Sequence, residues 1–426
     1  MGMLTLYRFI LYLISPIILG ILALKAIRNP AFRPRLGQRF GFSTVNPIPG
    51  GIWIHAVSVG EVNAAMPLIQ YALKNHPDLE ITVTTMTATG SARVMSLFPQ
   101  KIHHRYLPYD YPGAVSRFIN TVKPSVAMIM ETEIWPNLID VCHRKKIPVI
   151  YTNARLSRRS YEKYQRIQRL IGPTLRKVDR FAVQGSADAD RLIKLGAVPD
   201  TVSVTGNLKF DIPVPASLEE AAQDVRRHLG HDRFIWIAGS THDGEEEQVI
   251  DAFRSIRESI PELLLVLVPR HPERFSLVAR LCDREGFNLV RRSEHLEPVS
   301  MDTEIYLGDT MGELTLLLAA SDVAFIGGSL VPIGGHNLLE ANALGVPVVF
   351  GPHMHNFLEI SQLVSNKGAG VEINDSDELA NVVVKLLQDP VQRDQYGSRG
   401  KELVMENKGA LGNIANILKK QLGSRG

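Results

Sequence analysis

Short apolar runs alternate with amphipathic, helix-like stretches along most of this chain, and this rhythm constrains the fold more than any other feature. Short apolar runs bounded by turn residues are typical of buried strands, and a helix after each strand is the pattern of βαβ units. We therefore expect parallel sheets covered by helices on both faces. The predicted strands form two series, at 52–56, 81–85, 126–130, 149–152 and 181–184, and at 234–238, 263–268, 288–290, 323–326 and 346–350.

The two series are separated by residues 211–217, which contain two prolines and interrupt the rhythm. A chain of 426 residues is long enough for two cores of ordinary domain size. We expect one doubly wound domain at 29–212 and a second at 213–426, with a helical tail that could pack on either domain. If the two domains face each other, the loops that follow their strands meet at one cleft, where ligands of open α/β sheets bind.

The amino-terminal segment 3–24 is almost wholly apolar and about long enough to span a bilayer. Five basic residues and no acid follow it, which by the positive-inside tendency keeps the rest of the chain on the cytoplasmic side. We expect residues 1–28 to be a single-pass membrane anchor. Arg8 and Pro16 fit a helix that lies in the membrane interface equally well, so that alternative stays open.

Composition excludes several classes of protein. A net charge of +3 with scattered basic residues gives no groove for a polyanion, so we expect no nucleic-acid partner. Cys142 and Cys282 lie far apart without metal-type spacing, which argues against a disulfide framework and a cysteine zinc site. A reducing compartment is expected.

A glycine-rich segment, 326–340, connects a predicted strand to a predicted helix. Its glycine pairs let the backbone approach a ligand, and Asn337 can cap the helix that follows. Because the first amides of a helix lack intrahelical partners, we expect a phosphate to bind here, with Glu340 placed to accept hydrogen bonds from a ribose or a base. The alternative is an ordinary strand-to-helix turn.

Two predicted strand ends carry candidate carboxylates. Glu61 opens the helix after the first strand and could act as a general base, or it could be a first-turn glutamate favoured by the helix dipole. Glu131 and Glu133 follow the third strand and would point to opposite sides if that strand continued, so we expect only Glu131 to face the cleft. Its alternative role is an ion pair with a basic side chain from 153–163. No G-x-G-x-x-G pattern is present here, which disfavours nicotinamide chemistry.

Basic side chains are candidates for binding acidic substrates. Arg155, Arg158 and Arg159 suit an acceptor that bears phosphate or carboxylate, although they could equally form a solvated helix face. Lys209 lies next to the predicted domain boundary and could neutralise a leaving phosphate, or be a surface lysine. Arg270 is the strongest cation candidate for a phosphate or an acidic sugar.

Residues 309–313 precede a predicted helix, and their amides with Glu313 could complete a nucleotide pocket. Acidic clusters elsewhere look like helix starts and not like metal sites. The D-x-D strings at 188–190 and 375–377 are expected to be capped by Ser186 and Asp375, and 245–247 to be a solvated first turn. We therefore expect no metal site and no cofactor.

Taken together, these segments resemble a known family. The anchor and the motifs at 55–61, 131–137, 206–211, 269–272, 309–313 and 327–340 are similar to the 3-deoxy-D-manno-octulosonic acid (Kdo) transferases of Gram-negative lipid A assembly. The resemblance implies a GT-B architecture, in which two Rossmann-like doubly wound domains face each other across a cleft. It also implies transfer of Kdo from CMP-Kdo to a lipid A precursor (lipid IVA) at the bacterial inner membrane, by metal-independent inverting displacement.

The same resemblance assigns roles to individual positions. Glu61 would be the proton acceptor, and Glu131 and Lys209 would support the transition state. The positions implied to surround CMP are Pro269, Arg270, Met311, Gly312, Glu313, Asn337, Leu338, Leu339 and Glu340. Two other functions remain open at this point: a nucleotide-sugar epimerase of the same architecture, and a non-catalytic, membrane-tethered nucleotide-sugar-binding protein.

Overall fold

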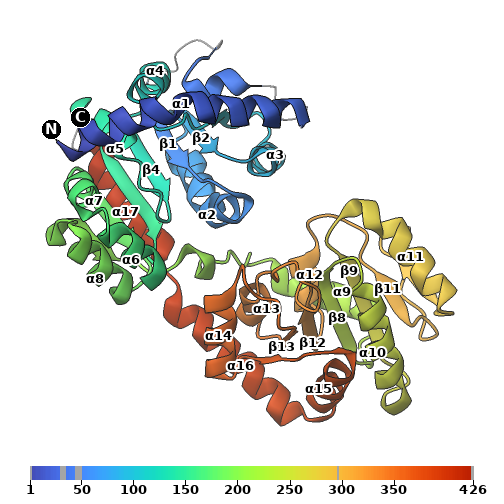
Figure 1. Cartoon of the computed structure of the whole chain (residues 1–426). Coiled ribbons are helices and arrows are strands. Elements are labelled where there is room, and N and C mark those ends of the chain that lie inside the picture. The colour runs from blue at the N-terminus through green and yellow to red at the C-terminus, as the bar shows by residue number, and fades with distance from the viewer. Residues whose placement is uncertain (1, 29–34, 44–49, 295–296, 424–426) are drawn as a thin grey trace. The chain divides into compact units, whose positions relative to one another are not determined.

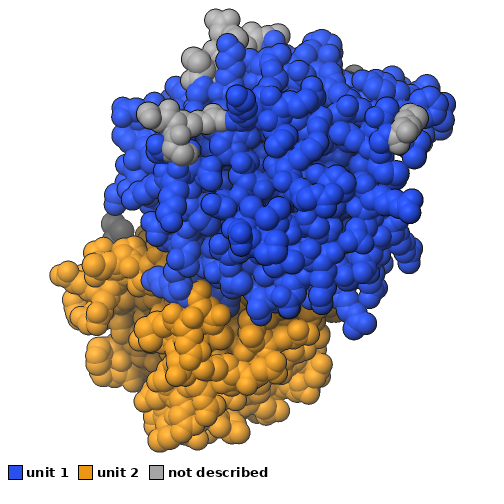
Figure 2. Space-filling model, turned by 90° about the vertical axis from the view of Figure 1, so that its left-hand side faces the viewer, with its two compact units in different colours: residues 1–211, 408–426 blue, residues 212–407 orange. Residues whose placement is uncertain are grey.

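The computed structural model describes residues 2–28, 35–43, 50–294 and 297–423, and the chain forms two compact units (Figure 1). Unit 1 comprises residues 1–211 and 408–426, and unit 2 comprises residues 212–407 (Figure 2).

Unit 1 is built on one parallel sheet of seven strands within its described residues, in the order β3-β2-β1-β4-β5-β6-β7. Its strands are β1 (Ile52–His55), β2 (Ile81–Thr85), β3 (His103–Tyr106), β4 (Val126–Met130), β5 (Val149–Ala154), β6 (Arg180–Val183) and β7 (Val202–Val204). Its helices are α1 (Met3–Arg28), η2 (Leu36–Phe40), α2 (Val59–Asn75), α3 (Ala88–Leu97), α4 (Pro112–Val122), α5 (Pro136–Arg144), α6 (Arg158–Gln165), α7 (Gln168–Leu175), α8 (Ser186–Leu195), η3 (Pro199–Thr201), η4 (Leu208–Phe210) and α17 (Ala410–Gly423).

The central strands of this sheet are buried on both faces because their side chains alternate between two cores. On β1, Trp53 belongs to one core, whereas Ile52 and Ile54 belong to the other. Near-continuous apolar strands are expected where helices cover both faces of a sheet, and this confirms the predicted layer arrangement.

Unit 2 repeats this plan, with a parallel sheet in the order β10-β11-β9-β8-β12-β13-β14 among its described residues. The strands are β8 (Ile235–Thr241), β9 (Leu264–Pro269), β10 (Leu289–Arg291), β11 (Ile305–Leu307), β12 (Val323–Ile326), β13 (Val348–Phe350) and β14 (Gly370–Glu372). The helices are α9 (Leu218–Leu229), α10 (Glu246–Ser259), η5 (Pro272–Arg274), α11 (Phe275–Arg284), α12 (Leu314–Ala319), α13 (Leu339–Leu344), α14 (Leu358–Lys367), α15 (Ser376–Gln388) and α16 (Pro390–Asn407).

All ten predicted strands are present, with ends that differ by a few residues. Four strands were not predicted from the sequence: β3, β7, β11 and β14. Each is three or four residues long, and three of them, β3, β7 and β14, are the outermost strands of their sheets. Edge strands bury fewer side chains, so their sequences need not be continuously apolar. The segment 103–106, which reads His-His-Arg-Tyr, is an example.

The carboxyl terminus differs from the predicted division, which placed all of 213–426 in the second domain. Residues 408–426 cluster with unit 1, because α17 packs on α2 and buries Ala410, Ile414 and Leu418 in a core of that unit. Asp211 fixes the start of α17, since its carboxylate accepts hydrogen bonds from the backbone N–H of Gly409 at 2.7 Å and of Leu411 at 2.5 Å.

Candidate active site

In unit 1 the strand order turns back on itself at β1, which lies between β2 and β4. Chain connections leave β1 and β4 in opposite directions across the sheet, and this is the topological switch point where open α/β sheets bind ligands. Glu61 lies in the first turn of the helix that follows β1, and Glu131 lies in the loop that follows β4. The predicted rule therefore places both carboxylates at the functional edge of one sheet.

Glu61 lies in the first turn of α2 and caps it. The Ser58 hydroxyl accepts a hydrogen bond from the backbone N–H of Glu61 at 3.5 Å. In return, the Glu61 carboxylate accepts one from the backbone N–H of Val57 at 2.8 Å. This reciprocal arrangement resembles a capping box and holds the carboxylate in one orientation.

The surroundings of Glu61 make its carboxylate a stronger base than an exposed glutamate. Burial, above all, raises its pKa to about 8, although the Val57 hydrogen bond opposes the rise. The negative charges of Glu131 and Glu133 raise the pKa further, and the positive charge of Arg155 lowers it. A carboxylate with a pKa near 8 is mostly protonated at pH 7, and once ionised, as the pH approaches 8, it can accept a proton from a hydroxyl group.

The expectation that only Glu131 faces the cleft assumed that the strand continues through Glu133, and the strand ends before Glu131. Strand β4 ends at Met130, and Glu131 adopts a left-handed backbone with φ of 53°, so strand alternation no longer applies. Both Glu131 and Glu133 lie close enough to Glu61 to raise its pKa. Burial likewise raises the pKa of Glu133. Three carboxylates therefore gather at this switch point.

The three arginines of 155–159 do not share one environment. Arg155 donates from Nε to the Glu131 carboxylate at 3.1 Å, which is the ion pair weighed for Glu131 from the sequence. Arg158 lies on the surface of α6, where it pairs with Glu162, and its side chain is 89% exposed. Arg159 is also exposed. Arg155 thus lies with the carboxylates, whereas the other two lie on an exposed helix face.

Lys209 belongs to η4, a short helix that packs on α2. The side-chain oxygen of Asn207 caps this helix by accepting from the backbone N–H of Lys209 at 3.0 Å. The Asn153 side chain at the end of β5 accepts from the backbone N–H of Leu208 at 2.9 Å. Lys209 therefore lies in unit 1, on a short helix that packs against the helix carrying Glu61.

In unit 2 the switch point lies between β8 and β12. The glycine-rich segment 326–340 leaves β12 here, next to the loop after β8. Gly327 passes so close to that loop that an added Cβ atom would lie 2.6 Å from the carbonyl oxygen of Ser240. A glycine is required at this position by that close approach.

The first glycine pair does not present free amides to a phosphate, which corrects part of the sequence interpretation. The backbone N–H groups of residues 328–330 donate to the carboxylate of Glu245 at 2.7, 3.0 and 2.9 Å. The same carboxylate accepts from the backbone N–H of His242 at 3.2 Å. A protein carboxylate thus occupies the anion-binding amides, and the second half of the segment is left as the candidate phosphate site.

The prediction that 245–247 forms a solvated first turn is also wrong. Glu245 and Glu246 are fully buried, and only Glu247 is exposed. Glu246 forms an ion pair with Arg274 at 2.9 Å and accepts from the Thr241 hydroxyl at 3.2 Å. The position of this acidic run could have indicated its burial, because it follows β8 at the same sheet edge as the glycine-rich segment.

A histidine pair joins the two loops of this switch point. His242 Nε2 and His336 Nε2 lie 2.8 Å apart, and the rings stack at 5.1 Å between centroids. Burial, with nearby Arg270, lowers the pKa of His242 to about 4 and of His336 to about 3. Both rings are therefore neutral at pH 7, and one donates its proton to the other.

Arg270 and Glu340 lie in the same electrostatic environment. Arg270 follows β9, and its backbone N–H donates to the carbonyl of Thr241 at 3.0 Å. Burial raises the pKa of Glu340, while a hydrogen bond from Asn337 and the charge of Arg270 oppose that rise. The predicted cation and the predicted ribose-binding carboxylate are thus brought together.

Positions 337–339 differ in what they can offer a ligand. The Asn337 side-chain oxygen accepts from the backbone N–H of Leu339 at 3.3 Å, so Asn337 helps to begin α13. The side chains of Leu338 and Leu339 are fully buried. Only the backbone of these two leucines can therefore contact a nucleotide.

Residues 309–313 precede α12 as predicted, and arginines from the neighbouring strand hold them. Arg291 forms an ion pair with buried Asp309 at 2.9 Å. Arg292 forms one with Glu313 at 3.0 Å, and this partner lowers the pKa of Glu313. Met311 is 63% exposed at the tip of the loop.

The two D-x-D strings have local structural roles. Asp375 caps α15 as predicted, accepting from the backbone N–H of Glu378 at 2.9 Å. Ser186 does not cap α8, because it is the first residue of the helix and Gly185 occupies the capping position. Asp188 instead accepts from the backbone N–H of Leu156 at 2.8 Å and pairs with Arg191.

Comparisons with known proteins identify first the class and then the family. Residues 241–403 match the model described as glycosyl transferases group 1, and residues 34–212 match the model described as 3-deoxy-D-manno-octulosonic-acid transferase. With two Rossmann-like sheets and polar residues at both switch points, the protein is a glycosyltransferase of GT-B architecture.

The family follows from full-length relatives. A 3-deoxy-D-manno-octulosonic acid transferase of Haemophilus influenzae is 42% identical over 98% of this chain and 98% of its own length. One from Bordetella pertussis is 32% identical over 92% of each chain. The chain belongs to the Kdo transferase family, and it is an enzyme, which removes the non-catalytic binding protein as an alternative.

Solved structures share the fold more widely. A UDP-GlcNAc 2-epimerase from Neisseria meningitidis, bound to UDP-GlcNAc, matches with a TM-score of 0.55 at 14% identity, covering 88% of this chain and all of that one. This likeness shows the architecture alone. The family relationship, and not the epimerase fold likeness, therefore decides between the two activities weighed from the sequence.

Proposed function

We propose that this protein transfers Kdo from CMP-Kdo to a lipid A precursor, with inversion at the anomeric carbon and without a metal ion. Family membership supports Kdo as the transferred sugar. The observation that carries the chemical proposal is Glu61, a buried carboxylate with a raised pKa at the switch point of unit 1. A glycosyl transfer to a hydroxyl group needs a base of this kind.

The proposed step is a single displacement. An acceptor hydroxyl attacks the anomeric carbon of Kdo, the new carbon–oxygen bond forms, and the bond from that carbon to the CMP phosphate oxygen breaks. The hydroxyl proton passes to Glu61, and CMP leaves with the bonding electron pair. Glu131 and Lys209 support the transition state in this proposal. An arrangement of the two domains across a cleft stays a prediction.

The donor is proposed to bind unit 2 through the positions that the sequence singled out. These are Pro269, Arg270, Met311, Gly312, Glu313, Asn337, Leu338, Leu339 and Glu340. The charge of Arg270 suits the phosphate and the Kdo carboxylate, and the carboxylate of Glu340 suits hydroxyl groups of the ribose. Leu338 and Leu339 would contribute backbone N–H groups, because their side chains are buried.

The acceptor is proposed to be an anionic lipid, with Arg155, Arg158 and Arg159 as contacts for its phosphates. The apolar helix α1 supports a membrane location. The basic residues that follow it suit the anionic lipids of a cytoplasmic leaflet, which favours the cytoplasmic side of the bacterial inner membrane.

Substitution of Glu61 by Gln tests the chemical proposal. We expect turnover in a CMP-Kdo to lipid IVA transfer assay to fall by about 10²- to 10⁴-fold, because the base is lost. CMP affinity, measured by calorimetry, should stay within about twofold, since the proposed donor positions lie in unit 2. Glu80→Gln is the matched control, because Glu80 is an exposed glutamate of unit 1 that pairs with His103.

Near-normal turnover of Glu61→Gln would reject Glu61 as the base. A parallel reaction without lipid acceptor examines the epimerase activity that the shared architecture suggests. Release of an altered sugar nucleotide there would contradict the proposed transfer.

A further inference from the structure

One line of polar side chains on helix α1 bonds to the rest of unit 1. We call Tyr7, Arg8, Tyr12 and Ser15 the polar seam; their spacing places them on one face of a helix. Tyr7 donates to Asp110 at 3.0 Å, and the Ser15 hydroxyl lies 3.0 Å from that of Tyr111. The ring of Tyr12 lies 5.5 Å from the ring of Tyr111.

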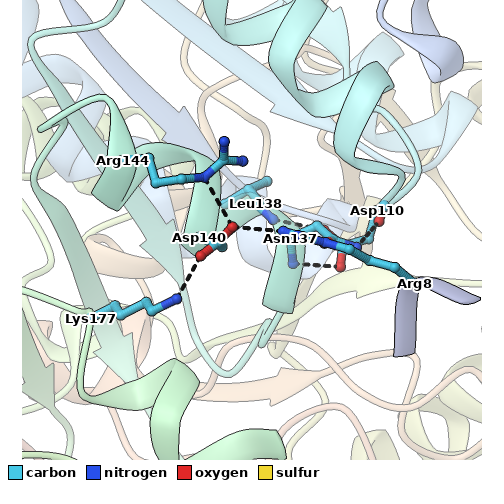
Figure 3. Close-up of polar contacts among 7 residues, drawn as sticks. All are labelled: Arg8, Asp110, Asn137, Leu138, Asp140, Arg144 and Lys177. Carbon is cyan, nitrogen blue, oxygen red and sulfur yellow. Dashed lines mark hydrogen bonds and ion pairs between the residues drawn. The ribbon is translucent and has the colours of Figure 1, made fainter. Parts of the chain in front are cut away.

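Arg8, the charged residue of the seam, is held by two side chains of α5. Its Nε donates to the Asn137 side-chain oxygen at 2.6 Å, and its Nη2 donates to Asp140 at 2.6 Å (Figure 3). Lys177 and Arg144 reach the same Asp140 carboxylate from the other side, at 2.5 and 3.1 Å. Bonds to these three cations outweigh the effect of burial and lower the pKa of Asp140, so it is ionised at pH 7.

The surface that receives the seam is held by its own hydrogen bonds. Asp110 is buried, and its carboxylate accepts from the backbone N–H of Asn137 at 2.9 Å and of Leu138 at 2.8 Å. These are the first turn of α5, so Asp110 fixes the helix that presents Asn137 and Asp140 to Arg8 (Figure 3). The seam therefore lies on a surface whose own side chains are hydrogen-bonded to the start of α5.

The other faces of α1 are apolar and uncovered by the protein. Phe9, Leu13, Ile17, Ile21 and Leu24 are between 57% and 68% exposed. The apolar stretch Met3–Leu24 has a mean hydropathy of 2.0, and no part of it is fully buried in the protein. A helix that lies at a membrane surface usually needs a polar face toward water. Here the polar face is turned to unit 1, which explains why the remainder can be apolar all round.

The seam also limits where the helix can go. Residues 3–15, about half of α1, run alongside the protein surface for roughly 20 Å. Only residues 16–28 extend beyond the seam, another ~20 Å, whereas the hydrocarbon core of a bilayer is about 30 Å thick. The chain is also tied to unit 1 again at Arg35, which donates from Nη2 to the carbonyl of His104 at 2.6 Å.

We propose that α1 lies in the plane of the membrane surface and does not span the bilayer, with its exposed apolar faces in the acyl-chain boundary of one leaflet. The occupant of this surface is a lipid bilayer. The sequence at and after the end of the helix is basic and carries no acid through residue 39, which suits anionic headgroups. Unit 1, with its three-carboxylate site, is thereby held against the leaflet from which a lipid acceptor is taken.

The test asks on which side of the membrane the amino terminus lies. Gly2→Cys places a thiol before α1, and Ala216→Cys places a reference thiol on an exposed position of unit 2. The native Cys142 and Cys282 are both buried, so they can remain. Each variant of the full chain is treated with a membrane-impermeant maleimide in inside-out and right-side-out vesicles of the expressing cell.

An in-plane helix predicts that both thiols are modified from the same side of the vesicle. Modification of the Gly2→Cys thiol only from the side opposite to the Ala216→Cys thiol would overturn the proposal, because the helix would then span. The readout does not depend on transfer activity, so failure of the proposed function and failure of this inference are distinguishable.

A second pair of variants asks whether the seam sets this topology. Arg8→Leu in the Gly2→Cys background removes the bonds to Asn137 and Asp140 and lengthens the apolar run. We expect part of the Gly2→Cys thiol to become accessible from the opposite side. Thr5→Leu is the control, since Thr5 is an exposed residue of the same helix outside the seam. Equal topology in Arg8→Leu and Thr5→Leu would contradict a topological role for the seam.

Discussion

At the scale of single residues, Glu61 combines a capping role with a proposed chemical one. Its carboxylate accepts from Val57 and closes the first turn of α2, which the sequence offered as the plain alternative to catalysis. The two roles are compatible, because a carboxylate has a second oxygen that the cap does not use. The cap keeps that oxygen in a fixed place.

The pH dependence of the reaction should report Glu61. Its pKa is raised to about 8, first by burial and then by Glu131 and Glu133, so the free enzyme holds this proton at neutral pH. A base must be ionised, and we therefore expect kcat/KM to rise about tenfold per pH unit below pH 8 and to level off above it.

Two variants should move that midpoint in opposite directions. Arg155→Gln removes a positive charge that lowers the pKa of Glu61, so the rise should shift to higher pH. Glu131→Gln removes a negative charge that raises it, so the rise should shift to lower pH. Kinetics across pH measure both, and a midpoint that stays unchanged in both variants would contradict the assignment to Glu61.

Glu245 holds the glycine-rich loop of unit 2, and its substitution should lower the stability of that unit. Glu245→Gln turns an N–H donor toward some of the four backbone N–H groups that the carboxylate now satisfies. Unpaired buried donors destabilise by about 1–3 kcal/mol each, so we expect the unfolding temperature of unit 2 to fall by about 5–10 °C. Calorimetry measures this, together with a CMP affinity at least tenfold weaker.

The neighbouring variant Glu247→Gln is the matched control, because Glu247 lies two positions away on the same segment and is exposed. It should leave both quantities nearly unchanged. An unfolding temperature that falls equally in the two variants would show that the buried carboxylate has no special role.

At the scale of elements, short helices and strands depend on what packs against them. All of unit 2 separates helix α17 from Asp211 in the sequence, yet α17 completes one core of unit 1 together with α2. Its amphipathic pattern predicts a helix but does not indicate which unit its apolar face packs against. The partner is chosen by complementary shape and by the Asp211 bonds to Gly409 and Leu411.

Ile414→Ala should therefore destabilise unit 1 and not unit 2. The side chain is fully buried, and truncating such a residue costs about 2–5 kcal/mol in the free energy of unfolding. Asn416→Ala, on the exposed face of the same helix, should cost less than about 0.5 kcal/mol. Denaturant unfolding followed by a probe in each unit distinguishes the two outcomes, and loss of unit 2 stability in Ile414→Ala would contradict the assignment of α17.

At the scale of the whole molecule, membrane binding and donor binding should be separable. Deleting residues 2–28 removes the apolar surface of α1 and leaves unit 2 complete. We expect the shortened protein to stop floating with vesicles of anionic lipid while its CMP affinity remains within about twofold. Continued flotation would mean that other surfaces hold the protein at the membrane.

The sequence by itself determined the periodic features: the ten longer strands, the parallel layer plan, the break near 211–217, the apolar amino-terminal segment and the family motifs. These follow from local patterns of burial and turn residues, which a chain carries along its length. Strand order then placed Glu61 and Glu131 at one edge, as the rule for open sheets predicts.

Only the tertiary structure decided which groups satisfy each other across large separations in sequence. It buried Glu245 against amides more than eighty positions away, brought Glu133 near enough to Glu61 to raise its pKa, packed α17 on unit 1 and docked Arg8 on Asp140. The physical reason is that a buried polar group must find a partner, and the nearest one in space is set by how elements pack. The distance in space between two such groups cannot be read from a single sequence.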